Sequence, residues 1–141
     1  ISPDAAICHG SSFDEDAYIF SVYDAEQAFE SLPNQITFFG HTHVPTLFTR
    51  RAENGETTLR ARLLSGRRTV IDLEPETRYL INPGSVGQPR DRDPRAAYAI
   101  FDTDSRRVYL YRVPYRIATA RRRIIQAGLP PVLGDRLLHG A

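Results

Sequence analysis

Three of the four histidines follow short apolar runs, and this placement constrains the fold more than any other feature of the sequence. Residues 5–8 (Ala-Ala-Ile-Cys) lead into His9, and residues 36–39 (Ile-Thr-Phe-Phe) are followed closely by His41 and His43. Short apolar runs of this kind are typical of buried strands. Because α/β folds place functional side chains in loops at strand ends, the pattern predicts an α/β fold with a site at these two ends.

The rest of the chain predicts one helix followed by antiparallel strands. Asp24 is expected to cap a helix that ends near Leu32, and Asn-Gly at residues 54–55 predicts a tight hairpin turn. Residues 96–101 and 108–113 form a second predicted hairpin, whose latter strand is apolar through its middle, as in a strand covered on both faces. A helix is expected over residues 115–127, and residues 129–141 are expected to be short helix or irregular.

Length and composition limit the class of protein. The chain has 141 residues, a formal net charge of +1 and one cysteine, Cys8, which cannot form an intrachain disulfide. These values predict one soluble cytoplasmic domain, with Cys8 as a buried core residue. No apolar run approaches the roughly 20 residues that a membrane span needs, so no membrane partner is expected. The chain lacks Met and begins with Ile1, which predicts that it is a piece of a longer protein.

The spacing of His41 and His43 suits metal binding. In an extended segment, residues two apart lie on one side with Cα atoms about 7 Å apart, so both imidazoles could serve one metal or two neighbouring metals. The alternative is that a histidine after a strand is an ordinary hydrogen-bonded loop residue. For His9 taken alone, that alternative is the better interpretation, and a bare His-x-His is as often incidental as functional.

Three motifs together resemble one known family. They are Cys-His-Gly-Ser at residues 8–11, Gly-His-Thr-His-Val-Pro at residues 40–45 and Asn-Pro-Gly-Ser at residues 82–85. In this order they resemble the later signatures of calcineurin-like metallophosphoesterases, in particular the small bacterial and archaeal phosphodiesterase branch. The resemblance extends from Ala5 to about Arg112.

The resemblance implies a fold, a cofactor and a reaction. It implies an α/β class, four-layer α/β/β/α sandwich, of which this chain supplies the C-terminal, mostly β portion. It implies two divalent metal ions (Mn, Fe, Ni, Co or Zn), with His9 and His41 as ligands of one and His43 as a ligand of the other. The implied reaction is hydrolysis of a phosphodiester or phosphomonoester, in a small molecule or nucleotide, by a hydroxide that the two metals activate.

The family's earlier signatures, which supply its carboxylate ligands and its catalytic histidine, are not found in this sequence. Residues 1–141 are therefore interpreted as the C-terminal portion of a single domain whose N-terminal part is absent, with no catalytic residue in this segment. Alone, the chain is expected to be inactive and to associate with itself or with its missing half. The alternative is a member of the same fold that has lost catalysis and serves as a scaffold for other proteins.

Ser85 and Arg90 are candidate substrate-binding residues. Arg90 could pair with a phosphate oxygen, and Ser85 could place its hydroxyl near the metal loops. The alternatives are a tight turn in which Asn82 and Ser85 bond their own backbone, and ion pairing of Arg90 with a neighbouring aspartate. The run Arg-Arg-Arg at residues 121–123 falls on a predicted helix and spreads around it, so nucleic-acid binding is not expected.

Overall fold

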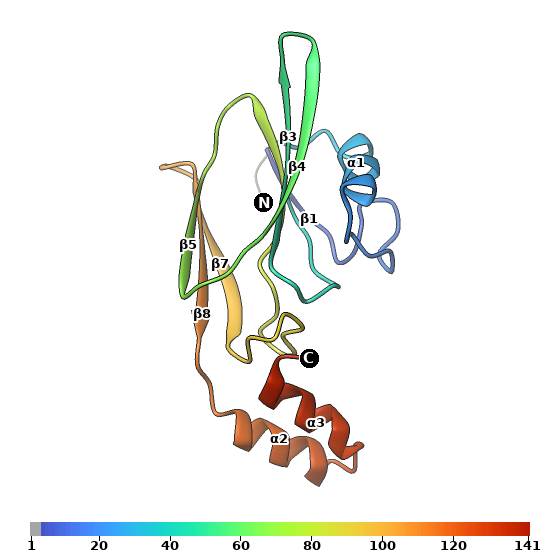
Figure 1. The fold of residues 1–141 in the computed structure, drawn as a ribbon, viewed down its shortest axis with the longest axis vertical. Coiled ribbons are helices and arrows are strands. Elements are labelled where there is room, and N and C mark those ends of the chain that lie inside the picture. The colour runs from blue at the N-terminus through green and yellow to red at the C-terminus, as the bar shows by residue number, and fades with distance from the viewer. Residues whose placement is uncertain (1–3) are drawn as a thin grey trace.

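The computed structural model describes residues 4–141 and contains two sheets and three helices (Figure 1). The strands are β1 (Ala5–Ile7), β2 (Ile36–Phe38), β3 (Thr46–Glu53), β4 (Glu56–Leu63), β5 (Arg68–Asp72), β6 (Thr77–Asn82), β7 (Ala96–Asp102) and β8 (Arg107–Val113). The helices are α1 (Val22–Ser31), α2 (Ile117–Gln126) and α3 (Pro131–His139).

The larger sheet is mixed and has the strand order β1-β2-β6-β3-β4. Strands β1, β2 and β6 are parallel, with Ile7 opposite Phe38 and Phe38 opposite Ile81. The carboxyl ends of these three strands therefore lie side by side at one edge of the sheet. This arrangement confirms the two predicted apolar strands and brings the loops that follow them together.

The β3–β4 hairpin extends the sheet and projects beyond the rest of the molecule (Figure 1). Its turn contains Asn54 with φ 53° and Gly55 with φ 82°. Two successive positive φ angles are the geometry that Asn-Gly favours in a two-residue hairpin turn. The predicted hairpin is confirmed.

The smaller sheet is antiparallel, has the order β5-β8-β7 and packs against the larger one. Val108 and Leu110 of β8 share a buried core with Ile36 and Ile81 of the larger sheet. Tyr109 and Tyr111 of β8 are partly exposed, and the Arg68 guanidinium lies 5.2 Å from the centre of the Tyr109 ring. The expectation that β8 is covered on both faces is therefore wrong, because its tyrosines face outward with an arginine over them.

Helix α1 covers the outer face of the larger sheet. It buries Ala25, Ala28 and Phe29 against Phe48 and Leu80. Its N-cap is Ser21 rather than the predicted Asp24. Asp24 instead occupies the third helical position and accepts a hydrogen bond from the Ser21 backbone N–H at 2.8 Å, which completes a capping box.

The predicted four-layer sandwich is present in part. Within residues 4–141, one helix and two packed sheets form three layers, whereas α2 and α3 form a hairpin beyond the end of the sheets (Figure 1). Residues 129–141, expected to be short helix or irregular, contain α3, which has Pro131 as its first residue and Gly140 as its C-cap. Among residues 4–141, no helix is long and apolar enough to cross a membrane.

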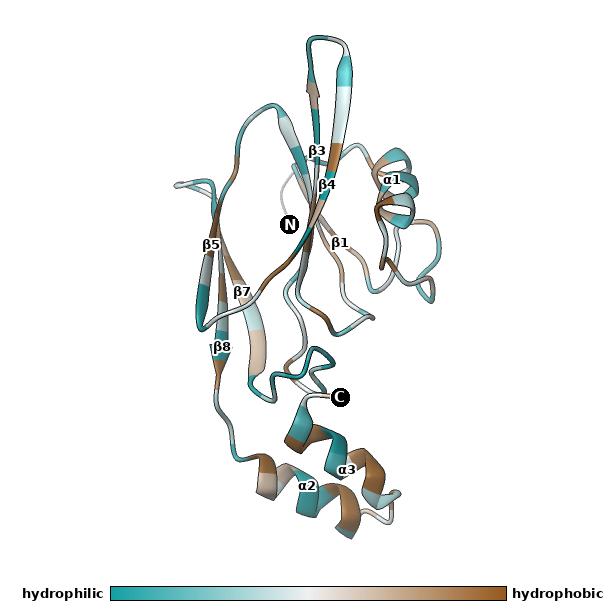
Figure 2. Cartoon of the chain, in the orientation of Figure 1, coloured by the Kyte–Doolittle hydropathy of each residue, from teal (hydrophilic) through white to brown (hydrophobic). Residues whose placement is uncertain are grey.

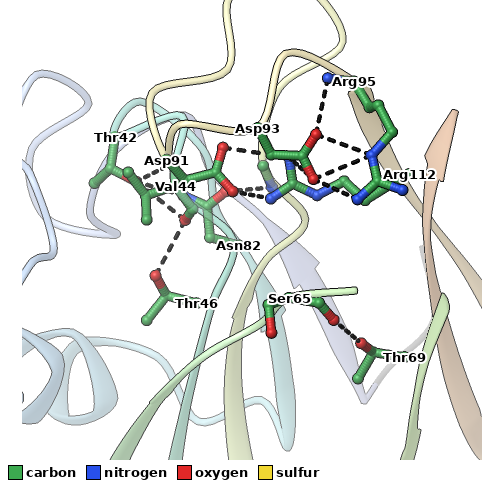
Figure 3. A network of polar contacts seen from close by, with 11 residues as sticks. Thr42, Val44, Thr46, Ser65, Thr69, Asn82, Asp91, Asp93, Arg95 and Arg112 are labelled. Atoms are coloured by element: carbon green, nitrogen blue, oxygen red, sulfur yellow. Dashed lines mark hydrogen bonds and ion pairs between the residues drawn. The ribbon is translucent and has the colours of Figure 1, made fainter. Parts of the chain in front are cut away.

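A buried arginine organises the loop that follows Arg90. The Arg112 side chain, only 5% exposed, pairs with the carboxylate of Asp91. Asp93 binds Arg95 through two oxygens, with Oδ1 2.9 Å from Nε and Oδ2 2.6 Å from Nη2 (Figure 3). The loop is also tied to the C-terminal helix, since the backbone N–H of Arg92 donates to the Gly140 carbonyl at 2.9 Å.

The Asp93 carboxylate should support the fold in acid. Its hydrogen bonds with Arg95 lower the Asp93 pKa to about 2, compared with about 3.9 for an unfolded aspartate. The stability that this carboxylate supplies is therefore complete above about pH 4 and is lost as the pH falls toward 2. Asp93→Asn should lower the urea midpoint at pH 6, and the difference from wild type should shrink from pH 4 to 2. Asp104→Asn, in the exposed β7–β8 turn, is the control; a pH-independent difference for Asp93→Asn would contradict this account.

Candidate metal-binding site

His9 and His41 meet at the carboxyl ends of adjacent strands. His41 Nδ1 lies 3.0 Å from His9 Nε2, and the ring centres are 4.8 Å apart with an interplanar angle of 62°. The loops are joined beneath the rings by a hydrogen bond from the Gly40 N–H to the His9 carbonyl at 2.8 Å. Two side chains 32 residues apart in the sequence therefore direct ring nitrogens at each other.

The spacing of these nitrogens suits a shared cation. Two nitrogens bound at about 2.1 Å to one cation, at a right angle, lie about 3.0 Å apart. The same spacing also fits an N–H···N hydrogen bond between the two neutral rings. The distance is therefore compatible with two ligands of one metal and equally with a direct hydrogen bond between the rings.

His43 is oriented by a backbone acceptor. Its Nδ1 lies 2.8 Å from the Gln88 carbonyl, which favours the tautomer that donates from Nδ1 and leaves Nε2 as an acceptor. Metal-binding histidines commonly use their second nitrogen in this way. Burial lowers the pKa of His43, the Gln88 bond opposes that shift, and the charges of Arg90, His41 and His9 lower the pKa further. The three histidines are thus close enough for the charges of His9 and His41 to affect the pKa of His43.

The histidine loop turns instead of running straight. His41 and His43 both have φ 61°, in the left-handed region that residues with a Cβ rarely adopt. The expected extended His-x-His segment is therefore wrong. Left-handed residues cost of order 1 kcal/mol each and persist where surrounding contacts fix them, which is common at functional sites.

Asn82 is the contact that fixes this loop. Its side chain is fully buried and donates to the Gly40 carbonyl at 2.8 Å and to Thr42 Oγ1 at 2.9 Å, while its Oδ1 accepts from the Gly84 N–H at 2.8 Å. Figure 3 shows Asn82 beside Thr42. The predicted turn-capping role is confirmed by the last bond. The two donated bonds join the end of β6 to the histidine loop, and sequence reasoning missed them because they depend on β2 and β6 being neighbours.

Tyr18 is a second residue that the sequence analysis missed. Its ring stacks on His41, with ring centres 4.0 Å apart and an interplanar angle of 24°. Gly10 explains how Tyr18 reaches this position, because a Cβ there would lie 2.3 Å from the Glu15 carbonyl oxygen and 2.6 Å from that of Ala17. The only signal in the sequence was therefore the glycine after His9, which allows the following loop to fold back.

Ser85 and Arg90 lie beside the histidine loop. Ser85 Oγ accepts hydrogen bonds from the backbone N–H groups of Gly87 and Gln88 at 3.1 and 2.9 Å, as the turn interpretation predicts. The Arg90 backbone N–H donates to the His43 carbonyl at 3.3 Å, and its exposed side chain lies 3.5 Å from Gln88 Oε1. The alternative in which Arg90 pairs with a neighbouring aspartate is wrong, since Asp91 and Asp93 bind other arginines.

The donor set fits a complete two-metal centre poorly. In residues 4–141, no group of three or more His, Cys, Asp or Glu side chains is arranged to hold a metal ion. Cys8, expected in the core, is half-buried; its Sγ donates to the Gly10 carbonyl at 3.2 Å, and burial raises its thiol pKa. The described site therefore offers imidazole nitrogens but no carboxylate to bridge two cations.

Comparison with known proteins identifies the family. The family model for the calcineurin-like phosphoesterase superfamily domain matches residues 3–106. The chain is also 40% identical over 105 residues to the uncharacterized protein MJ0912 of Methanocaldococcus jannaschii, a match that covers 74% of this chain and 39% of that protein. The chain belongs to the calcineurin-like phosphoesterase superfamily.

Two solved structures share the fold. A metallophosphoesterase from Sphaerobacter thermophilus superposes with a TM-score of 0.87 at 39% identity, over 100% of this chain and 57% of that one. The hypothetical protein PH1004 from Pyrococcus horikoshii gives 0.65 at 18% identity, over 96% of this chain and 46% of that one, which supports the fold alone. The chain thus spans about half the length of these structures and less of the curated relative.

The comparison also corrects one prediction. The sequence was interpreted as only the C-terminal part of such a phosphoesterase. That interpretation is wrong, because the superfamily domain matches from residue 3 onward and the structural match covers the whole chain.

Replacing Asn82 should destabilise the site and the fold together. Asn82→Asp keeps the acceptor for Gly84 but removes the donors to Gly40 and Thr42 and buries a charge, so the free energy of unfolding should fall by about 3 kcal/mol. Urea denaturation monitored by circular dichroism measures the change. Asn54→Asp, the same replacement in an exposed turn, should change stability by less than about 0.5 kcal/mol. Equal losses of stability in Asn82→Asp and Asn54→Asp would contradict the role of Asn82 in fixing the histidine loop.

The Tyr18 stack should be visible in solution. The Tyr18 ring lies over His41, so its ring current should shift the carbon-bound ring protons of His41 upfield in the NMR spectrum. Tyr18→Leu should remove this shift, Tyr18→Phe should retain it, and Phe13→Leu in the same loop should leave it unchanged. Unchanged His41 proton shifts in Tyr18→Leu would show that the two rings do not stack.

Proposed function

We propose that this chain is a metal-dependent phosphoesterase that acts on phosphomonoesters or phosphodiesters; two divalent cations, when bound, would supply the activated hydroxide. Family membership supports phosphoester hydrolysis as the class of reaction. The observation that carries the metal dependence is the 3.0 Å separation of His9 Nε2 and His41 Nδ1. Imidazole ligands suit Mn, Fe, Co, Ni or Zn and do not select among them.

Each histidine has a distinct proposed role. His9 and His41 would hold one cation through the facing nitrogens, and His43 would hold a second through Nε2, since Gln88 already binds its Nδ1. Arg90 is the proposed contact to a substrate phosphate, because its side chain is exposed beside His43 and its charge reaches that ring. Ser85 is a weaker candidate, since its oxygen already accepts two backbone hydrogen bonds.

The lack of a carboxylate beside the three histidines predicts weak activity for this chain. Neutral imidazoles do not offset the charge of two dications, and no acidic side chain joins them in the described residues. We therefore expect the purified chain to hydrolyse bis-p-nitrophenyl phosphate slowly or not at all with added Mn²⁺. Fast hydrolysis that His41→Ala abolishes would contradict the proposed need for carboxylates.

One observation favours a second candidate function, a scaffold that has lost catalysis. His9 and His41 are close enough to satisfy each other by a direct hydrogen bond, which requires no metal. A scaffold of this kind would bind protein partners through its surface and would not bind cations at the histidine loop.

Metal titration separates the two candidates. Isothermal titration with Co²⁺ or Zn²⁺ should show binding that His41→Ala weakens by about tenfold to a hundredfold, because one of two facing ligands is lost. His139→Ala, which removes an exposed histidine at the end of α3, should leave the affinity unchanged. Absence of binding by the wild-type chain, or equal affinities of the two variants, would favour the scaffold.

A further inference from the structure

In the part of the chain that the structure describes, the α2–α3 hairpin touches the rest of the fold only at its C-terminal end, where the Gly140 carbonyl accepts from the Arg92 N–H. Among the described elements, the two helices pack only against each other, and no residue of α2 is buried. A helix of ten residues is marginally stable in water without tertiary packing. Brown segments in Figure 2 mark apolar residues on both helices, and several of these, such as Ile125 and Leu138, are exposed. Its surface is therefore suited to contact with another molecule.

A groove between the two helices combines apolar and basic side chains. Its volume is about 390 Å³, and its lining includes Ile125 and Leu138, which are 38% and 44% exposed, with Arg121 and Arg122. Arg121 pairs with Asp135 at 2.6 Å, whereas no ion pair within residues 4–141 involves the exposed Arg122 or Arg123. We call this surface the basic groove. It is suited to a segment with an apolar side chain and several carboxylates.

Residues 13–16, which we call the acidic loop, have this composition. Phe13 is 55% exposed and is followed by three exposed acidic residues, Asp14, Glu15 and Asp16. The loop is closed at its base, because the backbone N–H of Ser11 lies 3.0 Å from the carbonyls of both Asp14 and Ala17. A preorganised loop loses less conformational entropy on binding.

Charge is divided between these two regions of the chain. Residues 13–32 contain six acidic residues and no arginine, whereas residues 114–141 contain five arginines and one acidic residue. The acidic loop lies near α1 and the hairpin lies beyond the end of the sheets, so the two surfaces do not meet within one molecule (Figure 1). They are complementary only between molecules.

We propose that the acidic loop of one copy of this chain binds the basic groove of a second copy. Phe13 enters the groove against Ile125 and Leu138, and the following carboxylates pair with Arg122, which lines the groove, and with the adjacent exposed Arg123. The contact joins two different surfaces, so the two copies are arranged head-to-tail. In each dimer, one copy keeps an unoccupied acidic loop and the other keeps an unoccupied basic groove. No residue of this interface is one of the three histidines, although the acidic loop precedes Tyr18, which stacks on His41.

Complementary charge reversals test the interface directly. Sedimentation velocity of the wild-type chain should show self-association that weakens as NaCl rises from about 50 mM to about 500 mM. Glu15→Arg with Asp16→Arg should weaken self-association about tenfold or more, as should Arg122→Glu with Arg123→Glu. An equimolar mixture of these two variants should associate again. The acidic loop of the arginine-reversed variant can bind the basic groove of the other variant, and the reversed loop and reversed groove are also complementary.

A charge reversal on β4 serves as the control for the same sedimentation experiment. Arg60→Glu with Arg62→Glu makes the same charge change on exposed β4 residues and should leave self-association unchanged, and circular dichroism should show that every variant is folded. A wild-type chain that is monomeric at every concentration would overturn the proposal, as would a mixture that stays monomeric. A monomer that binds anionic phosphatidylserine vesicles would assign the groove to lipid and would also overturn it.

Discussion

Parallel pairing of β1, β2 and β6 is the constraint on which the candidate site depends. Because the three strands run in one direction, the segments that follow them leave the sheet at the same edge. His9, the histidine loop and the turn at Asn82 therefore meet, although they are separated by tens of residues in the sequence. Without this pairing, the ring nitrogens of His9 and His41 would have no reason to lie 3.0 Å apart.

Side chains from outside the histidine motifs give the site its shape. Asn82 holds two left-handed histidines in place from the end of β6, and Tyr18 covers the His41 ring from a loop that Gly10 allows to fold back. Gln88 fixes the ring of His43 through its backbone carbonyl. The geometry is thus set before any ligand binds, which lowers the entropic cost of binding one.

Local patterns predicted the strands and the histidine placement but not the contacts between loops. The apolar runs before His9 and His41 and the Asn-Gly turn are local signals, and all three were confirmed. The stack of Tyr18 on His41 and the buried pairing of Arg112 with Asp91 depend on which strands are neighbours. The cap of α1 shifted from Asp24 to Ser21 because both residues belong to one capping box.

The central claim is that His9 and His41 act as a pair of ligands. The most direct measurement is an NMR titration of the imidazole ¹⁵N resonances with Zn²⁺. The account predicts that His9 Nε2 and His41 Nδ1 shift together and saturate at the same metal concentration. Independent titration of the two rings, or no response from either, would contradict it.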